Sequence, residues 1–102
     1  MIVILSDKAE TDIEDIGDWI ARDKPLRAVT FMQELRRSCA GLADRPLRFE
    51  LVDRFRRFGL RRRVHAPCLI LYIVRGESVF ILRVVHGARD IAALLTEDSW
   101  FD

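Results

Sequence analysis

Side chains suited to binding anions are concentrated in one stretch of this 102-residue chain. Residues 44–63 contain eight arginines and three acidic residues, which gives the segment a net charge of +5. Arginine holds carboxylates and phosphates through two parallel hydrogen bonds, a geometry that lysine does not offer. The segment therefore predicts a surface for a nucleic acid backbone or for an acidic protein segment. A solvated face that only balances acidic residues elsewhere is the third interpretation.

The balancing negative charge lies near the N-terminus. Residues 6–24 contain seven acidic and three basic residues, a net charge of −4, although the whole chain carries only +1. The near-neutral total therefore conceals a strong asymmetry between two segments.

The residues that acid–base chemistry needs are scarce. Cleavage of RNA without a metal ion requires a base for the 2′-hydroxyl, an acid for the leaving oxygen and cations for the phosphate. His65 and His86 are the only histidines, and a histidine at a strand end is more often a hydrogen-bonded structural residue. Tyr72, the only tyrosine, lies within an apolar run, and the only lysines are Lys8 and Lys24. Either histidine could still supply the base, so these residues alone leave both catalysis and binding open.

The two cysteines give no sign of a metal site. Cys39 and Cys68 are 29 residues apart and form no close-spaced ligand pair of the kind that zinc sites contain. Free cysteine is commonly buried as a small apolar residue. We predict that both lie in the core and that the protein holds neither metal nor cofactor.

Hydrophobic periodicity predicts an α+β domain that spans residues 1–102. An apolar run forms a strand, and a Ser6-Asp7 cap then begins a helix that ends near Asp23. Pro25 starts a second helix, and the short connection makes the two helices an antiparallel hairpin. The predicted order begins with strand 2–5, helices 7–23 and 25–43, and a loop 44–57. Three strands follow at 58–65, 68–74 and 79–85, and then a short helix at 88–95. The helical hairpin packs on an antiparallel sheet.

Three arginines lie within the predicted strands. Alternation from Phe58 predicts that Arg61 and Arg63 line the solvent-facing side of the first strand, while Arg62 breaks the pattern. Arg83 lies inside an apolar strand, where an unpaired charge is costly. We predict that Arg83 has a carboxylate partner, either within the chain or on a bound protein.

The two central strands are apolar on both faces, yet one helical hairpin covers only one face of a sheet. The second face needs the terminal helix, a partner protein, or both. Trp100 and Phe101, in the polar tail 96–102, are candidates either to anchor a partner or to fold back on that face. The chain is therefore not expected to act alone.

No apolar run approaches the roughly 20 residues that span a bilayer. Met1 is followed directly by an apolar strand and then by acidic residues, without the basic region or cleavage site of a signal peptide. The sequence predicts a cytoplasmic protein without a membrane partner.

The ordered set of segments resembles the ParE toxins of the RelE/ParE superfamily of bacterial toxin–antitoxin systems. The resemblance rests on Leu5–Ala9, the acidic helix, the start at Pro25 with Ala28 and Phe31, the arginine-rich loop, Leu69–Tyr72, and the motif His86-Gly87-Ala88-Arg89-Asp90. It implies a RelE/ParE-like fold and a ParD-like antitoxin that wraps around the toxin.

The superfamily has two branches that act differently. RelE-like members cut messenger RNA on the ribosome with arginines, lysines and a tyrosine beyond the last strand, whereas ParE-like members inhibit DNA gyrase. Arg89 matches the arginine that follows the last strand, but Leu94 and Leu95 occupy the region of the tyrosine and the loop lysines are absent. The resemblance therefore implies a gyrase inhibitor.

The sequence predicts a non-enzymatic toxin, with a ParD-like antitoxin and DNA gyrase as partners and no direct sequence-specific binding of nucleic acid. The alternatives are a ribosome-dependent endoribonuclease and a degenerate, non-toxic binding module. The candidate residues for contact with the antitoxin or the target are Arg61, Arg63, Arg83, His86, Arg89, Trp100 and Phe101.

Overall fold

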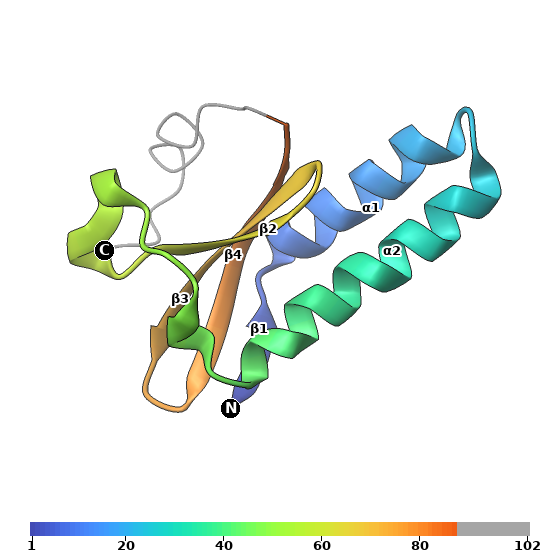
Figure 1. Ribbon diagram of the computed structural model, residues 1–102. Helices are drawn as coiled ribbons and strands as arrows, with labels where there is room; N and C mark the ends of the chain where they lie inside the picture. The colour runs from blue at the N-terminus through green and yellow to red at the C-terminus, as the bar shows by residue number, and fades with distance from the viewer. Residues whose placement is uncertain (88–102) are drawn as a thin grey trace.

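The computed structural model describes residues 1–87. It contains strand β1 (Ile2–Leu5), helices α1 (Asp7–Ala21) and α2 (Pro25–Ala40), and strands β2 (Arg61–His65), β3 (Cys68–Arg75) and β4 (Ser78–His86), as Figure 1 shows. Three short 3₁₀ helices, η1 (Gly41–Ala43), η2 (Pro46–Arg48) and η3 (Asp53–Phe58), connect α2 to β2. The predicted helix 88–95 and the tail 96–102, with Arg89, Trp100 and Phe101, lie outside the described residues.

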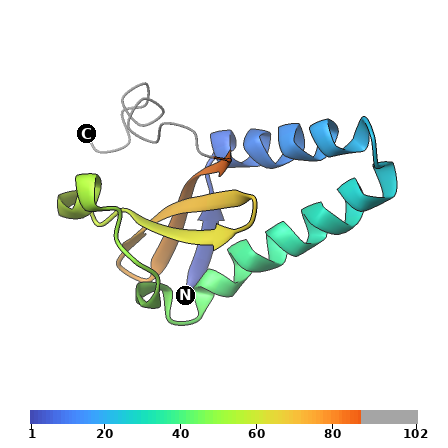
Figure 2. The same ribbon diagram turned by 45° about the horizontal axis from the view of Figure 1, so that its top comes forward.

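The helices begin where the local sequence predicts. The Ser6 hydroxyl accepts a hydrogen bond from the amide of Ala9 (3.0 Å), which caps the exposed N–H groups of α1. Pro25 occupies the first turn of α2, where its missing N–H leaves no gap in the hydrogen bonding. The predicted helical hairpin is confirmed: the two helices lie side by side and antiparallel (Figures 1 and 2).

The four strands form one sheet in the order β1-β4-β3-β2. The antiparallel pairs β2–β3 and β3–β4 agree with the sequence prediction, and Gly76 makes the β3–β4 turn with a positive φ of 59°. β1 joins β4 in parallel, so the sheet is mixed. The parallel pairing arises because the helical hairpin carries the chain across one face of the sheet before β2 begins. The α+β fold class is confirmed.

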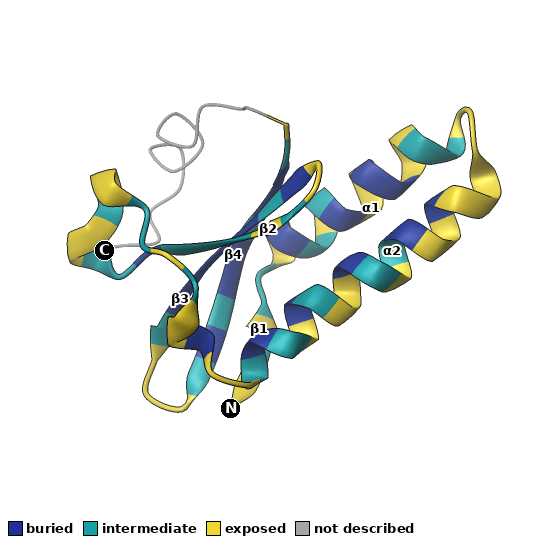
Figure 3. Ribbon diagram, in the orientation of Figure 1, coloured by how far each residue is buried: buried dark blue, intermediate teal, exposed yellow. Residues whose placement is uncertain are grey.

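The main core lies between the helices and the sheet (Figure 3). It is built from the apolar stripes of the two helices and from one face of β3 and β4, including Ile13, Phe31, Leu35, Ile70 and Tyr72. Both cysteines belong to it, as predicted.

A smaller cluster occupies the second face of the sheet. It contains the buried residues Leu60, Leu71, Ile73, Leu82 and Val85. Val52 and Phe55, from the segment that the sequence predicts to be a loop, pack against it. Part of the cover of the second face therefore comes from η3 and its neighbours, which the sequence prediction did not name, while cover by the terminal helix or a partner stays a prediction.

The prediction of a strand from Phe58 to residue 65, which corresponds to β2, was wrong in two respects. β2 begins at Arg61, because Phe58 ends η3 and Gly59 adopts a left-handed φ of 73°. Arg61 and Arg63 stand opposite Tyr72 and Ile70, so they lie on the helix-covered side and not on the solvent-facing side. The side chain of Val64, at 62% exposure, takes the position that the pattern assigns to arginine.

Candidate functional site

Arg83 has a carboxylate partner within its own chain, which is one of the two arrangements that the sequence predicts for it. Its guanidinium donates two hydrogen bonds to Asp12 of α1, with Nε–Oδ2 and Nη2–Oδ1 distances of 2.7 and 2.9 Å. Asp12 Oδ2 also accepts the amide of Val84 at 2.9 Å, and both charged side chains are only 13% exposed. The contact joins α1 to β4 across 71 residues of sequence, which gives Arg83 a structural role.

Arg61 and Arg63 bind backbone carbonyl groups of their own chain. Arg63 donates to the carbonyl of Ser38 (2.8 Å), near the C-terminal end of α2, where the helix dipole favours a positive charge. Arg61 donates to the carbonyls of Leu47 (3.1 Å) and Phe49 (2.6 Å). These bonds hold the connection between α2 and β2 against the strand. Contact of either arginine with a partner remains a prediction.

Both histidines have neighbours within the fold. A hydrogen bond of 2.6 Å joins His65 Nδ1 and Ser38 Oγ, and the His65 ring lies edge-on to Phe31 with 5.5 Å between centroids. His86 packs against Trp19 with 5.1 Å between ring centroids. These contacts agree with the structural interpretation of both residues.

Tyr72 and the cysteines are not available as nucleophiles or bases at neutral pH. The Tyr72 hydroxyl is buried and donates to the carbonyl of Pro46, and burial raises the Tyr72 pKa although Arg61 and Arg48 oppose the shift. Burial raises the pKa of the Cys39 thiol to about 11, against the opposing effect of Arg36, and raises that of Cys68 to about 11 as well. All three groups therefore stay protonated.

Within residues 1–87, no three histidine, cysteine or acidic side chains are arranged to hold a metal ion. In the same part of the chain, no helix is long and apolar enough to cross a bilayer.

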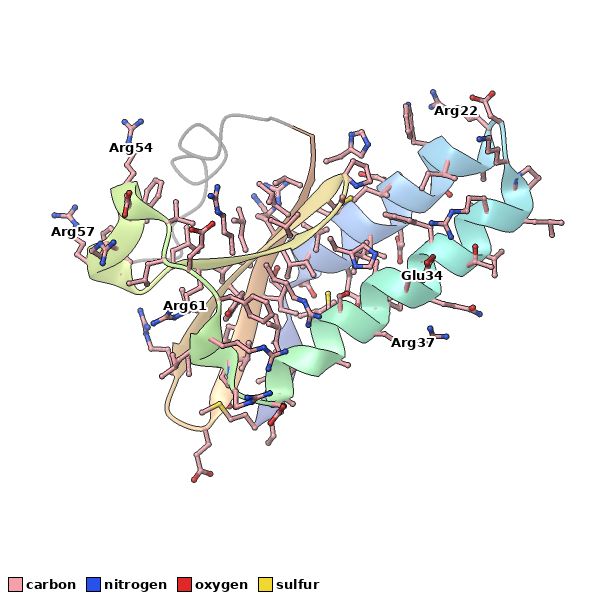
Figure 4. The ribbon with its side chains drawn as sticks, viewed as in Figure 1. Arg22, Glu34, Arg37, Arg54, Arg57 and Arg61 are labelled. Atoms are coloured by element: carbon pink, nitrogen blue, oxygen red, sulfur yellow. The ribbon has the colours of Figure 1, made fainter. Side chains whose placement is uncertain are left out.

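The arginine-rich segment forms one end of the molecule, away from the tip of the helical hairpin (Figures 1 and 4). Each of its acids already has an arginine partner: Glu50 pairs with Arg62 at 2.7 Å, Asp53 with Arg56 at 2.8 Å, and Asp44 lies near Arg45 and Arg48. We call the five arginines around η3 the basic end: Arg54, Arg56, Arg57, Arg61 and Arg62.

A hollow of about 460 Å³ opens on the basic end. It is lined by four of the five arginines and by Glu50, Leu51, Val52 and Asp53. Figure 4 shows the side chains of Arg54 and Arg57 pointing away from the molecule. The sequence predicts an anion-binding segment here, but the residues that it singles out are Arg61 and Arg63. The signal that was missed is that Arg54 and Arg57 flank Phe55 in a 3₁₀ segment, and that Phe55 packs on the second face of the sheet.

A second surface lies at the tip of the helical hairpin. A cleft of about 370 Å³ is lined by Trp19, Ile20, Asp23, Lys24, Arg27, Phe31, Ala66, Pro67 and His86. Trp19 is 58% exposed and Leu26, close by in sequence, is 83% exposed. Of the predicted contact residues within residues 1–87, only His86 lies here, and Trp19 was missed because it stands three residues after Ile16, at ordinary helical spacing.

Comparison with known proteins gives two findings. The family model described as the ParE toxin of type II toxin–antitoxin system, parDE, matches residues 3–91. A solved structure described as "Chromosomal ParDE TA system from P. aeruginosa" has a similar fold, with a TM-score of 0.72 and 20% sequence identity over 86% of this chain and 97% of that chain. The search of curated proteins finds no match.

Proposed function

Because the chain belongs to the ParE toxin family of type II toxin–antitoxin systems, we propose that it inhibits DNA gyrase by binding and cuts no RNA. Its place of action is the cytoplasm, and a ParD-like antitoxin neutralises it. The family description and the related ParDE structure support the pairing with an antitoxin of this kind.

The observation that carries the proposal is the state of the groups that a nuclease would use. Tyr72 is buried and bonded to Pro46, and His65 is bonded to Ser38 beside the Phe31 ring. The Tyr72 hydroxyl is therefore not placed to exchange protons with a bound RNA, and Nδ1 of His65 is already engaged within the fold. Lys8 lies in the first turn of α1 and Lys24 at the hairpin tip, both outside the arginine-rich segment. The described residues thus favour binding over catalysis.

The exposed apolar residues of the helical hairpin support a protein partner. Trp19, Leu26 and Val29 are each more than half exposed, at 58, 83 and 55%, and they lie at or near the hairpin tip. Large apolar side chains in such positions are typical of protein–protein contacts. They are available to the antitoxin or to the target.

The test compares gyrase activity with RNA integrity in one system. Purified toxin should inhibit DNA supercoiling by gyrase, and addition of the cognate antitoxin should restore activity. Expression of the toxin without the antitoxin should arrest growth and induce DNA-damage signalling while bulk mRNA stays intact. Rapid, codon-positioned cleavage of mRNA on ribosomes would instead establish the endoribonuclease alternative. A well-folded toxin that produces neither effect would indicate a non-toxic binding module.

The His65→Asn variant sharpens this test. It removes one of the two histidines that could replace a catalytic base, and the amide keeps the capacity to bond Ser38 Oγ. Under the proposal, His65→Asn inhibits gyrase as well as the wild type does. A loss of toxicity at unchanged melting temperature would point to acid–base chemistry.

A further inference from the structure

We propose that the basic end is a sequence-independent binding surface for the phosphate backbone of duplex DNA. This adds a second contact to the toxin's action, and the choice of duplex DNA over other polyphosphates rests on the proposed gyrase target. Four features of the described residues support it: uncompensated charge, exposure, a fixed geometry and a hollow of suitable size.

The charge at the basic end is only partly neutralised within the fold. Asp53 pairs with Arg56 and Glu50 with Arg62, while Asp44 lies near Arg45 and Arg48. Among the described residues, no carboxylate lies within ion-pair distance of Arg54, Arg57 or Arg61. The partners of Arg61 are neutral carbonyl groups, so its full positive charge remains. These three guanidiniums are therefore a source of uncompensated positive potential.

Two arginines of the basic end, and the end of η3 itself, are also held in place. Arg57 lies over the Phe58 ring at 4.7 Å, and Arg56 is tied to Asp53 within the same turn. Arg75 of β3 donates to the carbonyl of Phe58 at 3.0 Å and fixes the end of η3 to the sheet. A surface that is ordered before binding loses less conformational entropy when it binds.

The chemistry of the surface suits phosphate. Guanidinium groups bind phosphate oxygens in a two-pronged geometry, and the hollow of about 460 Å³ between Arg54, Arg56, Arg61 and Arg62 is open to solvent on a polar surface. Backbone contacts of this kind give affinity without sequence reading. Because η3 consists of two short 3₁₀ turns that meet at a non-helical Phe55, and is not a long helix, it offers no element to lie in the major groove.

The experiment measures binding of the purified 102-residue toxin to fluorescent duplexes of about 20 base pairs and two unrelated sequences, without gyrase, over a range of salt concentrations. The test variant is Arg54→Glu/Arg57→Glu. The matched control is Arg22→Glu/Lys24→Glu, which makes the same change in charge at two exposed positions of the hairpin tip. In the control, the helix-dipole effects at the end of α1 and the start of α2 oppose each other.

The wild type should bind both duplexes equally and lose affinity as salt rises. The test variant should bind at least about tenfold more weakly at low salt, with a log–log salt slope smaller by about two, one for each phosphate that the two arginines no longer neutralise. The control should retain most of the affinity. Melting temperatures of both variants should match the wild type. Absent binding by the wild type, or equal losses in the two variants, would overturn the inference.

Two further measurements distinguish duplex DNA from the other ligands that the basic end could bind, single-stranded RNA and an acidic protein segment. A larger effect of Arg54→Glu/Arg57→Glu on single-stranded RNA than on duplex DNA would overturn the assignment to DNA. Loss of antitoxin binding with unchanged DNA affinity would show that the basic end receives an acidic protein segment, and would also overturn it. Gyrase inhibition is scored separately, so DNA binding by a toxin that leaves gyrase active would contradict the proposed function and support this inference.

Discussion

Arg83 and Arg54 have the same side chain but opposite surroundings. Arg83 is bonded at two points to Asp12 between α1 and β4, whereas Arg54 points into solvent at the basic end. The first guanidinium has its charge satisfied inside the fold, and the second is available to a ligand. The role of an arginine is thus set by the partners that the fold already supplies.

Arg61 and Arg63 fall between these two extremes. They are half-buried and bonded, but their partners are carbonyl groups that leave the positive charge in place. Such residues can stabilise the fold and still contribute potential to a neighbouring surface. The comparison therefore predicts a graded series of stability losses, from Arg83 and its partner down to the exposed arginines.

Removal of Asp12, the partner of Arg83, should cause the largest loss of stability. Asp12→Ala leaves a nearly buried guanidinium without its carboxylate and the Val84 amide without its acceptor. We expect a loss of about 2 to 4 kcal/mol in the free energy of unfolding, measured by chemical denaturation. Glu14→Ala, an exposed change on the same helix, should cost less than about 0.5 kcal/mol. Similar results for the two variants would mean that the ion pair contributes nothing to stability.

Loss of the hydrogen bond between Tyr72 and Pro46, which anchors the segment between α2 and β2, should have the second largest effect on stability. Tyr72→Phe removes the buried hydroxyl that donates to Pro46 and leaves that carbonyl without this donor. The expected loss is about 1 to 2 kcal/mol of unfolding free energy. Toxicity should persist at temperatures where the variant is folded, because Tyr72 acts only through the fold. A stable but inactive Tyr72→Phe would contradict the assignment of this residue to structure.

Neighbouring arginines of β2 provide a sharper comparison. Arg63→Met should lower the free energy of unfolding by about 1 kcal/mol, because it removes the hydrogen bond to Ser38 and the stacking on Phe49. Arg62→Met breaks only an exposed pair with Glu50 and should cost less than about 0.5 kcal/mol. Denaturation curves of the two variants measure the difference. A reversed order would show that Arg62, and not Arg63, supports the strand.

Much of this arrangement could be predicted from sequence, because it depends on local periodicity. The stripes of α1 and α2, the Ser6 cap, Pro25 and the turn at Gly76 each act over a few residues. The need of Arg83 for a carboxylate also follows from burial, although the choice of Asp12 does not, since the two are 71 residues apart.

The parts that the sequence pattern could not predict depend on distant contacts. Arg61 and Arg63 alternate as a solvent-facing side would, yet the carbonyls that they bind lie 12 to 25 residues away. The η3 turn is too short to show a period, so Arg54 and Arg57 could not be separated from the rest of the segment. The parallel addition of β1 to β4 is likewise invisible to local patterns.

The smallest effect on stability is expected at the basic end itself. Both side chains in Arg54→Gln/Arg57→Gln are exposed, and neither has a carboxylate partner among the described residues, so the free energy of unfolding should change by less than about 0.5 kcal/mol. Among the described residues, the stacking of Arg57 on Phe58 is the contact at risk, and an amide retains part of it. Denaturation at low and at high salt measures the change. A gain in stability at low salt would show that the arginines repel one another in the folded chain, which is expected of positive charges that are paired only when a ligand binds. A loss above about 1 kcal/mol would mean that they stabilise the fold, and the contrast with Arg83 would fail.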